Sequence, residues 1–441
     1  MKIINILLMS LLLVSCNDSR TSSSILYKGN WENIFAKTLA TTDGAVVNPF
    51  NTSMYLKYFI DESLENKDDF ISKITGVYQE RINDLHKKFD RHHSYYVDLN
   101  EHNKGRIKNI KTVNESLDSG EFIELDEETY NLLKISVEYT KYSEGYFNIF
   151  VGELTDFWDE IFKDWTKDPY LYNIDPDNLD SKENERRLRE DILPLIPTID
   201  EIDEILEFND ETKSVRFNSL KDESGKSKGK ISISVGGIAK GYATELVKQE
   251  FIKQNYTQGY LFSGGSSISS LDKPIYNNSK GQNLSIVDPR TAGSLFDKKE
   301  AVSVYLKESF NMSTSGNYIG GKSFYYKINE TGEYITRHHI INPYTGYPED
   351  KGVASVSVFS EKLGADILDA FSTTLVNKSI EDGLKFREKV MNDVSLGNPD
   401  LEIIYILENL KDNTIEIQST SNFNNTITIA DSEGITFKYV K

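Results

Sequence analysis

Residues 231–245, ISISVGGIAKGYATE, decide the fold expected for this chain. Ile231, Ile233 and Val235 alternate with serines, which is the period-two pattern of a half-buried strand. The glycine pair 236–237 follows, and a helix is expected to begin directly after it. Glycine permits unusual backbone conformations and close approach of a ligand, while a helix start offers free N–H groups to an anion. The stretch therefore predicts a strand, a glycine turn and a helix that together hold a phosphate.

The expected helix has one apolar stripe and one early lysine. Ile238, Tyr242 and Leu246 recur at every fourth position, and Lys240 adds a positive charge to the first turn. The alternative is a plain strand-to-helix turn with a solvated Lys240. The chain contains neither GxGxxG nor GxxxxGK[ST] here, so neither a standard dinucleotide-binding fold nor a P-loop is supported.

The composition is that of an acidic globular protein. The 441 residues carry 50 Lys and Arg against 69 Asp and Glu, a formal net charge of −19, and 11% of them are aromatic. The aromatic content argues against disorder, and the negative charge argues against a nucleic-acid partner, which would need a concentrated basic surface. An anionic ligand would need local lysines or a metal ion.

The N-terminus has the pattern of an exported lipoprotein. Residues 1–15 combine Lys2 with an apolar run and small residues, as in a signal peptide, and LVSC at residues 13–16 resembles a bacterial lipobox. We expect Cys16 to be lipidated and to anchor the chain to the bacterial cell membrane, facing outside the cytoplasm, through a polar tether at residues 16–25. An incidental thiol is the alternative. Cys16 is the only cysteine, so no internal disulfide is expected.

Two regions of the N-terminal half contain residues that could bind a metal ion. A long helix is predicted at residues 68–89, and four histidines follow or flank its end: His86, His92, His93 and His102. Their spacing is poor for zinc, which favours solvated or packed histidines. Residues 167–190 form an acidic stretch that holds Asp175, Asp177 and Asp180. The pattern of a calcium loop is incomplete there, so a solvated acidic insertion is expected.

The C-terminal half predicts an α+β fold. From Val215 onward the pattern is one of short alternating strands bounded by turn signals, with two helices at residues 237–254 and 364–377.

The second of these helices carries a candidate metal site. In GADILDAFSTTL, residues 364–375, Asp369 and Thr373 are four residues apart and share a helix face. A carboxylate and a hydroxyl suit a partial Mg²⁺ shell that substrate phosphates complete. Asp366 could serve equally well, and a surface acid with an ordinary helix threonine is the alternative reading.

Two further stretches offer reactive groups. RHHIINPYTGYP, residues 337–348, places His339 at a strand end, where a neutral imidazole could accept a proton from an attacking hydroxyl. The alternative is that His339 is one of two exposed histidines. Residues 313–316, STSG, offer hydroxyls that could line a ligand site, although a polar turn has the same pattern.

In their order along the chain, GGIAKGYA, SGG, STSG, HIINPYTGYP and DAFSTTL resemble the ApbE family of FAD:protein FMN transferases. The resemblance covers most of the chain after the tether. It implies one ApbE-like domain at residues 26–441 with an acidic insertion around 164–190, built of mixed sheets and packed helices, with FAD in a cleft between two lobes. It also implies Mg²⁺-dependent transfer of FMN from FAD to a Ser or Thr hydroxyl of an exported flavoprotein acceptor, with release of AMP. The alternatives are an FAD pyrophosphatase and a non-catalytic flavin-binding lipoprotein.

The resemblance also implies roles for single residues. His339 would be the general base. The metal would be held by Gly237, through its carbonyl, and by Asp369, Ser372 and Thr373. FAD would contact Phe50, Tyr146, Phe147, Asn148, Ser234, Lys240 and Ile341. At Ser234, Asn148 and Asn342 the family carries acidic residues, and these three exchanges are the feature that favours the non-catalytic alternative.

Overall fold

The computed structural model describes most of the chain. The described residues are 28–42, 44–97, 105–167, 174–177, 181–272, 275–276, 279–292, 297–318, 323–328, 331–421 and 426–441. The expected signal peptide, Cys16, the whole tether, His102 and Asp180 lie outside them. No helix within the described ranges is long and apolar enough to cross a membrane.

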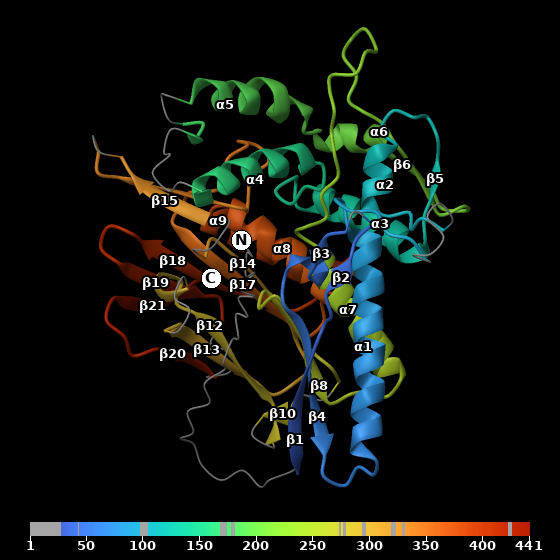
Figure 1. The fold of residues 1–441 in the computed structure, drawn as a ribbon. Helices are drawn as coiled ribbons and strands as arrows, with labels where there is room; N and C mark the ends of the chain where they lie inside the picture. Colours follow the sequence, from blue (N-terminus) through green and yellow to red (C-terminus); the bar gives the residue numbers. More distant parts are fainter. Residues whose placement is uncertain are drawn as a thin grey trace, which may run out of the picture.

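A mixed β-sheet runs through the molecule (Figure 1). Within the described residues its nine strands are, in spatial order, β1 (Gly29–Phe35), β4 (Met54–Asp61), β8 (Gly259–Ser263), β9 (Ser267–Ser270), β14 (Asn311–Gly316), β17 (Val353–Ser360), β18 (Glu402–Asn409), β19 (Thr414–Ser419) and β21 (Ile435–Tyr439). Neighbouring strands are antiparallel except for β19 and β21, which are parallel. The predicted α+β class is confirmed.

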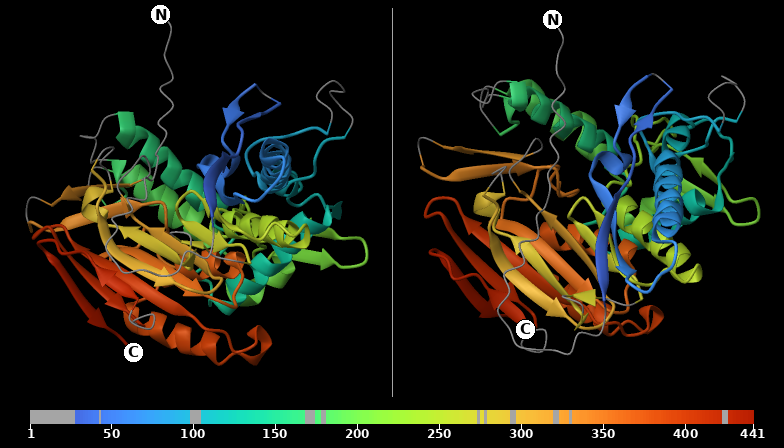
Figure 2. Two further views of the ribbon diagram at one scale, coloured as in Figure 1. Left: turned by 90° about the horizontal axis from the view of Figure 1, so that it is seen from below. Right: turned by 60° about the horizontal axis from the view of Figure 1, so that its bottom comes forward.

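The central sheet is buried on both faces. On β18, Ile403 and Tyr405 belong to one hydrophobic core, while Ile404 and Ile406 belong to another, as the period-two geometry of a strand requires. The first core packs under α7 (Ala239–Lys253) and α8 (Ala365–Asn377). The second is closed by a smaller sheet (Figure 2) of strands β12 (Gln282–Val287), β13 (Glu300–Leu306) and β20 (Ile427–Ile429).

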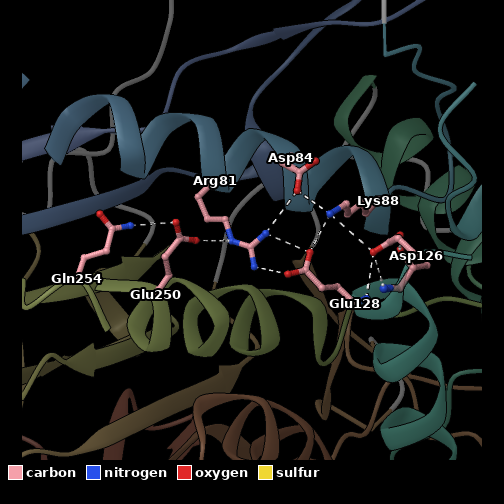
Figure 3. Close-up of polar contacts among 8 residues, drawn as sticks. Arg81, Asp84, Lys88, Asp126, Glu128, Glu250 and Gln254 are labelled. Atoms are coloured by element: carbon pink, nitrogen blue, oxygen red, sulfur yellow. Dashed lines mark hydrogen bonds and ion pairs between the residues drawn. The ribbon is translucent and has the colours of Figure 1, made fainter. Parts of the chain in front are cut away.

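The helix predicted at residues 68–89 is α1 (Lys67–Phe89), and a network of ion pairs fastens it to its neighbours (Figure 3). Arg81 of α1 pairs with Glu128 of α3 (Glu127–Tyr142) and lies 2.9 Å from Glu250 of α7. Lys88 lies 2.8 Å from the same Glu128. Burial alone would raise the pKa of Glu128, but its bonds to both cations lower it overall. The network therefore holds three helices in register around one half-buried carboxylate.

A third hydrophobic core lies apart from the first two. It joins α4 (Gly152–Lys167) to the turn at Arg187–Ile192, to β15 (Ser323–Lys327) and to Ile341, which follows β16 (Tyr334–His338). In Figure 1 α4 and β15 lie together at the top of the molecule, and contacts between them are present. The remaining elements are β2 (Leu39–Ala40), β3 (Val46–Val47), α2 (Ile110–Glu115), β5 (Ile123–Glu124), α5 (Lys182–Arg186), α6 (Ile202–Ile205), β6 (Leu206–Asn209), β7 (Ser214–Phe217), β10 (Ile275–Tyr276), β11 (Ser279–Lys280) and α9 (Ile380–Met391).

The strand predicted at residues 231–235 is wrong. The segment is not part of a β-ladder, because its partners are a side chain and a turn. The side-chain Oδ1 of Asn114 accepts the N–H of Ile233 at 2.7 Å, and its Nδ2 donates to the carbonyl of Ile233 at 3.0 Å. The N–H of Ser234 donates to the carbonyl of Ile149. Ser232 is buried as well, at 6% exposed, so the segment is enclosed on both sides at this point, whereas Ser234 is partly exposed and lines the cleft.

Two other expectations need correction. The acidic insertion is not wholly solvated, because Asp175 has no exposed surface and bonds Arg337 of β16 at 2.7 Å. The region after residue 215 contains a third longer helix, α9, which the sequence analysis missed. Gly383 in its first turn is a poor helix former, but a Cβ there would lie 2.3 Å from the hydroxyl of Tyr405, so close packing explains it.

Candidate active site

A cleft of about 570 Å³ lies between the first core and the layer built around the third core. Its walls come from segments as distant in sequence as Phe50 and Thr373. Nearly every residue that the resemblance assigned to FAD or to the metal lines it: Phe50, Tyr146, Phe147, Asn148, Ser234, Gly237, Lys240, Ile341, Asp369 and Thr373. His339 lines it as well, so the fold brings the predicted base and the predicted ligand contacts to one place.

Asp369 is a buried carboxylate of the cleft, as is Asp90 at the other wall-forming segment. The side chain of Asp369 comes from α8, is 2% exposed, and accepts hydrogen bonds from the N–H of Gly241 at 3.0 Å and from the hydroxyl of Ser313 at 3.2 Å. Gly241 lies where α7 and α8 touch, since a Cβ there would lie 2.3 Å from the carbonyl oxygen of Ala365. One of the N–H groups expected to hold a phosphate at the start of α7 thus holds Asp369 instead.

Lys240 faces the same carboxylate. Its Nζ lies 3.6 Å from Oδ2 of Asp369 and 3.3 Å from the carbonyl oxygen of Gly236, and its side chain is 23% exposed. Lys240 is therefore a paired lysine of the cleft wall, and the alternative of a solvated surface lysine does not hold.

Close packing against neighbouring side chains explains the glycine at position 237. Neither Gly236 nor Gly237 has a positive φ, so no left-handed turn is needed. A Cβ on Gly237 would lie 3.2 Å from the ring of Phe147 and 3.4 Å from Oγ1 of Thr373. The missing side chain lets an aromatic wall and the α8 hydroxyl lie close to the backbone of Gly237.

Thr373 and Ser372 of α8 have different surroundings. Thr373 lines the cleft one turn after Asp369, and its hydroxyl donates to the carbonyl of Asp369 at 3.2 Å. Ser372 is wholly buried, does not line the cleft, and shares a 2.8 Å hydrogen bond with Ser315 of β14. The 313–316 stretch is a strand rather than a polar turn. Thr314, Ser315 and Gly316 line the cleft, as the sequence analysis expected of this stretch.

The two histidines at the end of β16 lie on opposite sides of the chain. His338 has no exposed surface, and burial lowers its pKa to about 4. Its Nδ1 accepts the N–H of Ile340, so its other nitrogen carries the proton and donates to the carbonyl of Glu349 at 2.8 Å. His339 is exposed and lines the cleft. The alternative of two exposed histidines is therefore wrong, because His338 is buried and only His339 of the pair is exposed.

Phe50 is held by a buried histidine. Its φ is 54°, a left-handed value that is rare for a bulky residue, and its N–H donates to Nδ1 of His86 at 3.1 Å. Burial lowers the pKa of His86 to about 4, so the ring is neutral. The proton on its Nε2 then points to Tyr95, whose hydroxyl donates to Asp90 at 2.7 Å. This chain of bonds fixes the backbone that places Phe50 in the cleft.

The histidines near the end of α1 form no recognisable zinc site. His86 and His93 both face Asp90, at 3.6 and 3.0 Å. In the described part of the chain no group of three or more His, Cys, Asp or Glu side chains is arranged to hold a metal ion. His102 lies outside that part.

The sequence analysis missed several cleft residues. Arg91, Asp156, Trp158, Asp159, Phe162 and Tyr318 also line the cleft. A signal existed for two of the three aromatic residues, because Trp158 and Phe162 are one helical turn apart and share a face of α4. The acidic character of the surrounding sequence hid that pattern.

Comparisons with known proteins agree with this architecture. A model of the ApbE family matches residues 51–396. A search of curated proteins found no match.

Three solved structures are similar to the chain over almost their whole length. The flavin transferase ApbE from Vibrio cholerae is 16% identical with a TM-score of 0.58, and covers 90% of this chain and 100% of its own. The ApbE protein from Thermotoga maritima is 20% identical with a TM-score of 0.55, covering 90% and 99%. The apo form of the flavinyl transferase ApbE from Pseudomonas stutzeri is 14% identical with a TM-score of 0.56, covering 91% and 98%. At these identities the likeness concerns the fold, and the family model, which spans most of the sequence, shows that the chain belongs to the ApbE family.

Proposed function

We propose that this protein transfers FMN from FAD to a Ser or Thr hydroxyl of an exported flavoprotein and releases AMP. The observation that carries the proposal is one cleft that joins Asp369 and Thr373 of α8, Lys240 of α7 and the exposed His339. A buried carboxylate, a cation and an imidazole that share one cleft suit phosphoryl transfer to a hydroxyl.

The donor set fits Mg²⁺. Asp369 supplies a hard carboxylate that retains unused lone pairs, and Thr373 and the carbonyl of Gly237 supply neutral oxygens within the same cleft. A site with a single carboxylate leaves coordination positions for substrate phosphates and water, which is the usual way proteins bind Mg²⁺. Ser372 is buried beneath the cleft wall and bonds Ser315, which itself lines the cleft. When bound, Mg²⁺ would supply neutralisation of the charge that develops on the transferring phosphoryl group.

The chain's own groups supply recognition of FAD. Phe50, Tyr146 and Phe147 present aromatic surface for the ring systems. Lys240, beside the start of α7, offers a charge for the pyrophosphate and offsets the net negative charge of the protein locally. Ser234, Asn148 and Ile341 complete the walls.

His339 would act as general base. The oxygen of the acceptor hydroxyl forms a bond to the phosphorus of the FMN half, the bond from that phosphorus to the bridging oxygen breaks, and AMP leaves with that oxygen. The hydroxyl proton passes to the imidazole of His339. An exposed position at the mouth of the cleft suits this role, because the acceptor is itself a protein.

Two of the three lost acidic residues have an explanation that does not require loss of activity. The side chain of Asn148 accepts the N–H of Phe150 at 2.8 Å, and that of Asn342 accepts the N–H of Tyr344 at 2.9 Å. An amide oxygen makes these turn-closing bonds as a carboxylate would. This supports an enzyme over a binding protein that has lost its activity.

The location of the reaction is also part of the proposal. Lipidation of Cys16 would hold the domain at the bacterial cell membrane, outside the cytoplasm, where an exported acceptor is within reach. The wild-type protein should incorporate labelled palmitate and be recovered in the membrane fraction. Cys16→Ser should lose both the label and the membrane recovery. Recovery of both forms in the soluble fraction would contradict this assignment.

The activity is tested by mixing the protein without its first 16 residues with FAD, Mg²⁺ and candidate exported flavoproteins. Intact mass should show covalent FMN on the acceptor. His339→Ala should abolish that mass increase while leaving FAD binding intact, and loss of binding would overturn the role of His339. Free FMN and AMP formed without any adduct would indicate a pyrophosphatase, and binding without turnover would indicate a flavin-binding protein.

A further inference from the structure

Asn377 is hydrogen-bonded to two segments that line the cleft. It is the last residue of α8, has no exposed surface, and does not line the cleft itself. Its Nδ2 donates to the carbonyl of Tyr146 at 3.0 Å and to the carbonyl of Ile341 at 3.2 Å. These carbonyls belong to two segments almost 200 residues apart in sequence, and both segments are expected to contact the flavin.

The same side chain lies on the helix that carries the proposed metal ligands. Asp369, Thr373 and Asn377 follow one another at intervals of four residues and therefore lie along one stripe of α8. The helix thus presents a carboxylate and a hydroxyl to the cleft and, one turn further on, an amide to the two flanking walls. A displacement of either wall relative to α8 would break a bond to Asn377.

The surroundings of Oδ1 indicate that the two bonds from Nδ2 are the contribution of the Asn377 side chain. Its Oδ1 is buried and has no hydrogen-bond partner among the described residues. A buried polar atom without a partner lowers the free energy of unfolding. An apolar side chain would avoid that loss, so the two bonds from Nδ2 are what the asparagine contributes.

The next residue holds the ring of Tyr146 in place. Lys378 is 6% exposed, and its Nζ lies 4.0 Å from the centre of the Tyr146 ring and 3.0 Å from Oε2 of Glu144. The carbonyl of Tyr146 is therefore fixed by Asn377 while its ring is fixed by Lys378. Together the two residues at the end of α8 determine both the position and the orientation of this aromatic wall.

We infer that Asn377 is a positioning residue for the flavin: it sets the distance between the Tyr146 and Ile341 walls relative to the metal-binding face of α8. The inference rests on the proposed function only in taking FAD as the ligand of the cleft. Because Asn377 touches no reacting group, its loss weakens FAD binding more than it slows transfer at saturating FAD.

The test compares FAD binding by the wild-type protein and by Asn377→Ala, measured through quenching of flavin fluorescence with Mg²⁺ present and no acceptor. We expect Kd to rise about tenfold, with kcat at saturating FAD within about threefold of wild type. Thr374→Val is the matched control, since Thr374 is equally buried on α8 and its hydroxyl, among the described residues, bonds the carbonyl of Ala370 alone, at 2.9 Å. The control should leave Kd unchanged.

A second measurement separates positioning from a general loss of stability. If Asn377 acts through Tyr146, the effect of Asn377→Ala on Kd should shrink in a Tyr146→Ala background. An unchanged Kd in Asn377→Ala accompanied by a lower Tm would overturn the inference, as would full additivity of the two substitutions. If Asn377→Ala does not fold, the isosteric Asn377→Asp, which replaces the donor by an acceptor, decides the question by the same measurement.

The outcomes also distinguish the inference from the proposed function. A wild-type protein that binds FAD but modifies no acceptor would contradict the function, while the binding data would still decide the role of Asn377. A wild-type protein that transfers FMN while Asn377→Ala keeps its affinity for FAD would contradict the inference alone. Absence of FAD binding by the wild-type protein would contradict both.

Discussion

The Nζ atom of Lys240 lies 3.6 Å from Oδ2 of Asp369, so this buried carboxylate of the cleft has a cation beside it. The same oxygen accepts the N–H of Gly241 from the first turn of α7. Helix start and lysine together stabilise the ionised carboxylate in a place that is 2% exposed. This arrangement makes Lys240 a competitor for a metal ion that binds at Asp369.

Lys240→Met should therefore have opposite effects on the two ligands. Removal of the competing charge should strengthen Mg²⁺ binding in the absence of FAD by a few-fold, while loss of the contact with the pyrophosphate should weaken FAD binding about tenfold. Calorimetric titration with each ligand alone measures both constants. If Mg²⁺ and FAD both bound more weakly to the variant, Lys240 would not be a competitor of the metal.

Asp369→Asn should fold and lose activity. The amide keeps an oxygen for one of the two bonds from Gly241 and Ser313, but it removes the charge that binds the metal. We expect turnover of FAD to fall by about 100-fold or more, with a Tm close to that of the wild type. Activity that survives in this variant and still depends on Mg²⁺ would place the metal elsewhere.

Asp366→Asn provides the matched control on the same helix. Asp366 does not line the cleft, and burial together with the nearby Glu245 raises its pKa to about 6. Between a pH of about 4, near its unfolded pKa, and about 6, the folded protein binds more protons than the unfolded one, so the free energy of unfolding falls as pH rises. Since Asp366 is partly exposed, we expect Asp366→Asn to be more stable than wild type by about 1–2 kcal/mol at pH 8 and equally stable at pH 4.

That control is measured by urea unfolding at both pH values and by turnover of FAD at pH 8. The activity should equal that of the wild type. A loss of activity comparable to that of Asp369→Asn would assign the metal to Asp366, which the sequence alone left open.

The acidic insertion should affect the active site through one buried ion pair. Asp175 has no exposed surface and Arg337 is 3% exposed; Arg337 lies two residues before His339 and also contacts Asp177 at 2.6 Å. Burial alone would lower the pKa of Arg337, but its two aspartates raise it overall. Asp175→Asn should lower the free energy of unfolding by about 2–4 kcal/mol, because it leaves a buried guanidinium with one exposed partner.

The same substitution should slow transfer to the acceptor, since Arg337 supports the strand that ends at His339. The double variant Asp175→Leu with Arg337→Met should recover much of the stability, because an apolar pair avoids the buried charges. Thermal unfolding and transfer rates of the three proteins check this. Wild-type transfer rates in a destabilised Asp175→Asn would show that the ion pair contributes to stability alone.

The helices that frame the site were predictable because their signals are local. The helical spacing of apolar residues placed α1, α7 and α8 to within two residues at each end. The spacing of Asp369 and Thr373 followed from the same periodicity, since residues four apart share a helix face. Strands after residue 215 were predictable for a similar reason, because alternation and turn residues mark them.

The parts that could not be predicted depend on partners distant in sequence. Residues 231–235 have the alternation of a strand, but the side chain of Asn114 makes the bonds that a neighbouring strand would make. Asp175 lies in a stretch that has the composition of solvated chain, and only Arg337, 162 residues later, buries it. Asn377 gives no signal in the sequence, because its role arises from two carbonyls brought together by the fold.

The prediction that the candidate residues share one site came from the family resemblance and not from residue patterns. Nothing in the local sequence joins Phe50, Lys240 and His339, yet all three line one cleft. Periodicity predicts which face of an element a residue occupies, but not which distant element that face will meet.

The most direct test of the account is the stoichiometry of the products. AMP, free FMN and covalent FMN on an exported acceptor are measured in one reaction that contains FAD, Mg²⁺ and the protein without its first 16 residues. We predict equal amounts of AMP and covalent FMN, no free FMN, and none of the products with Asp369→Asn. Equal amounts of AMP and free FMN with an unmodified acceptor would contradict the proposed transfer.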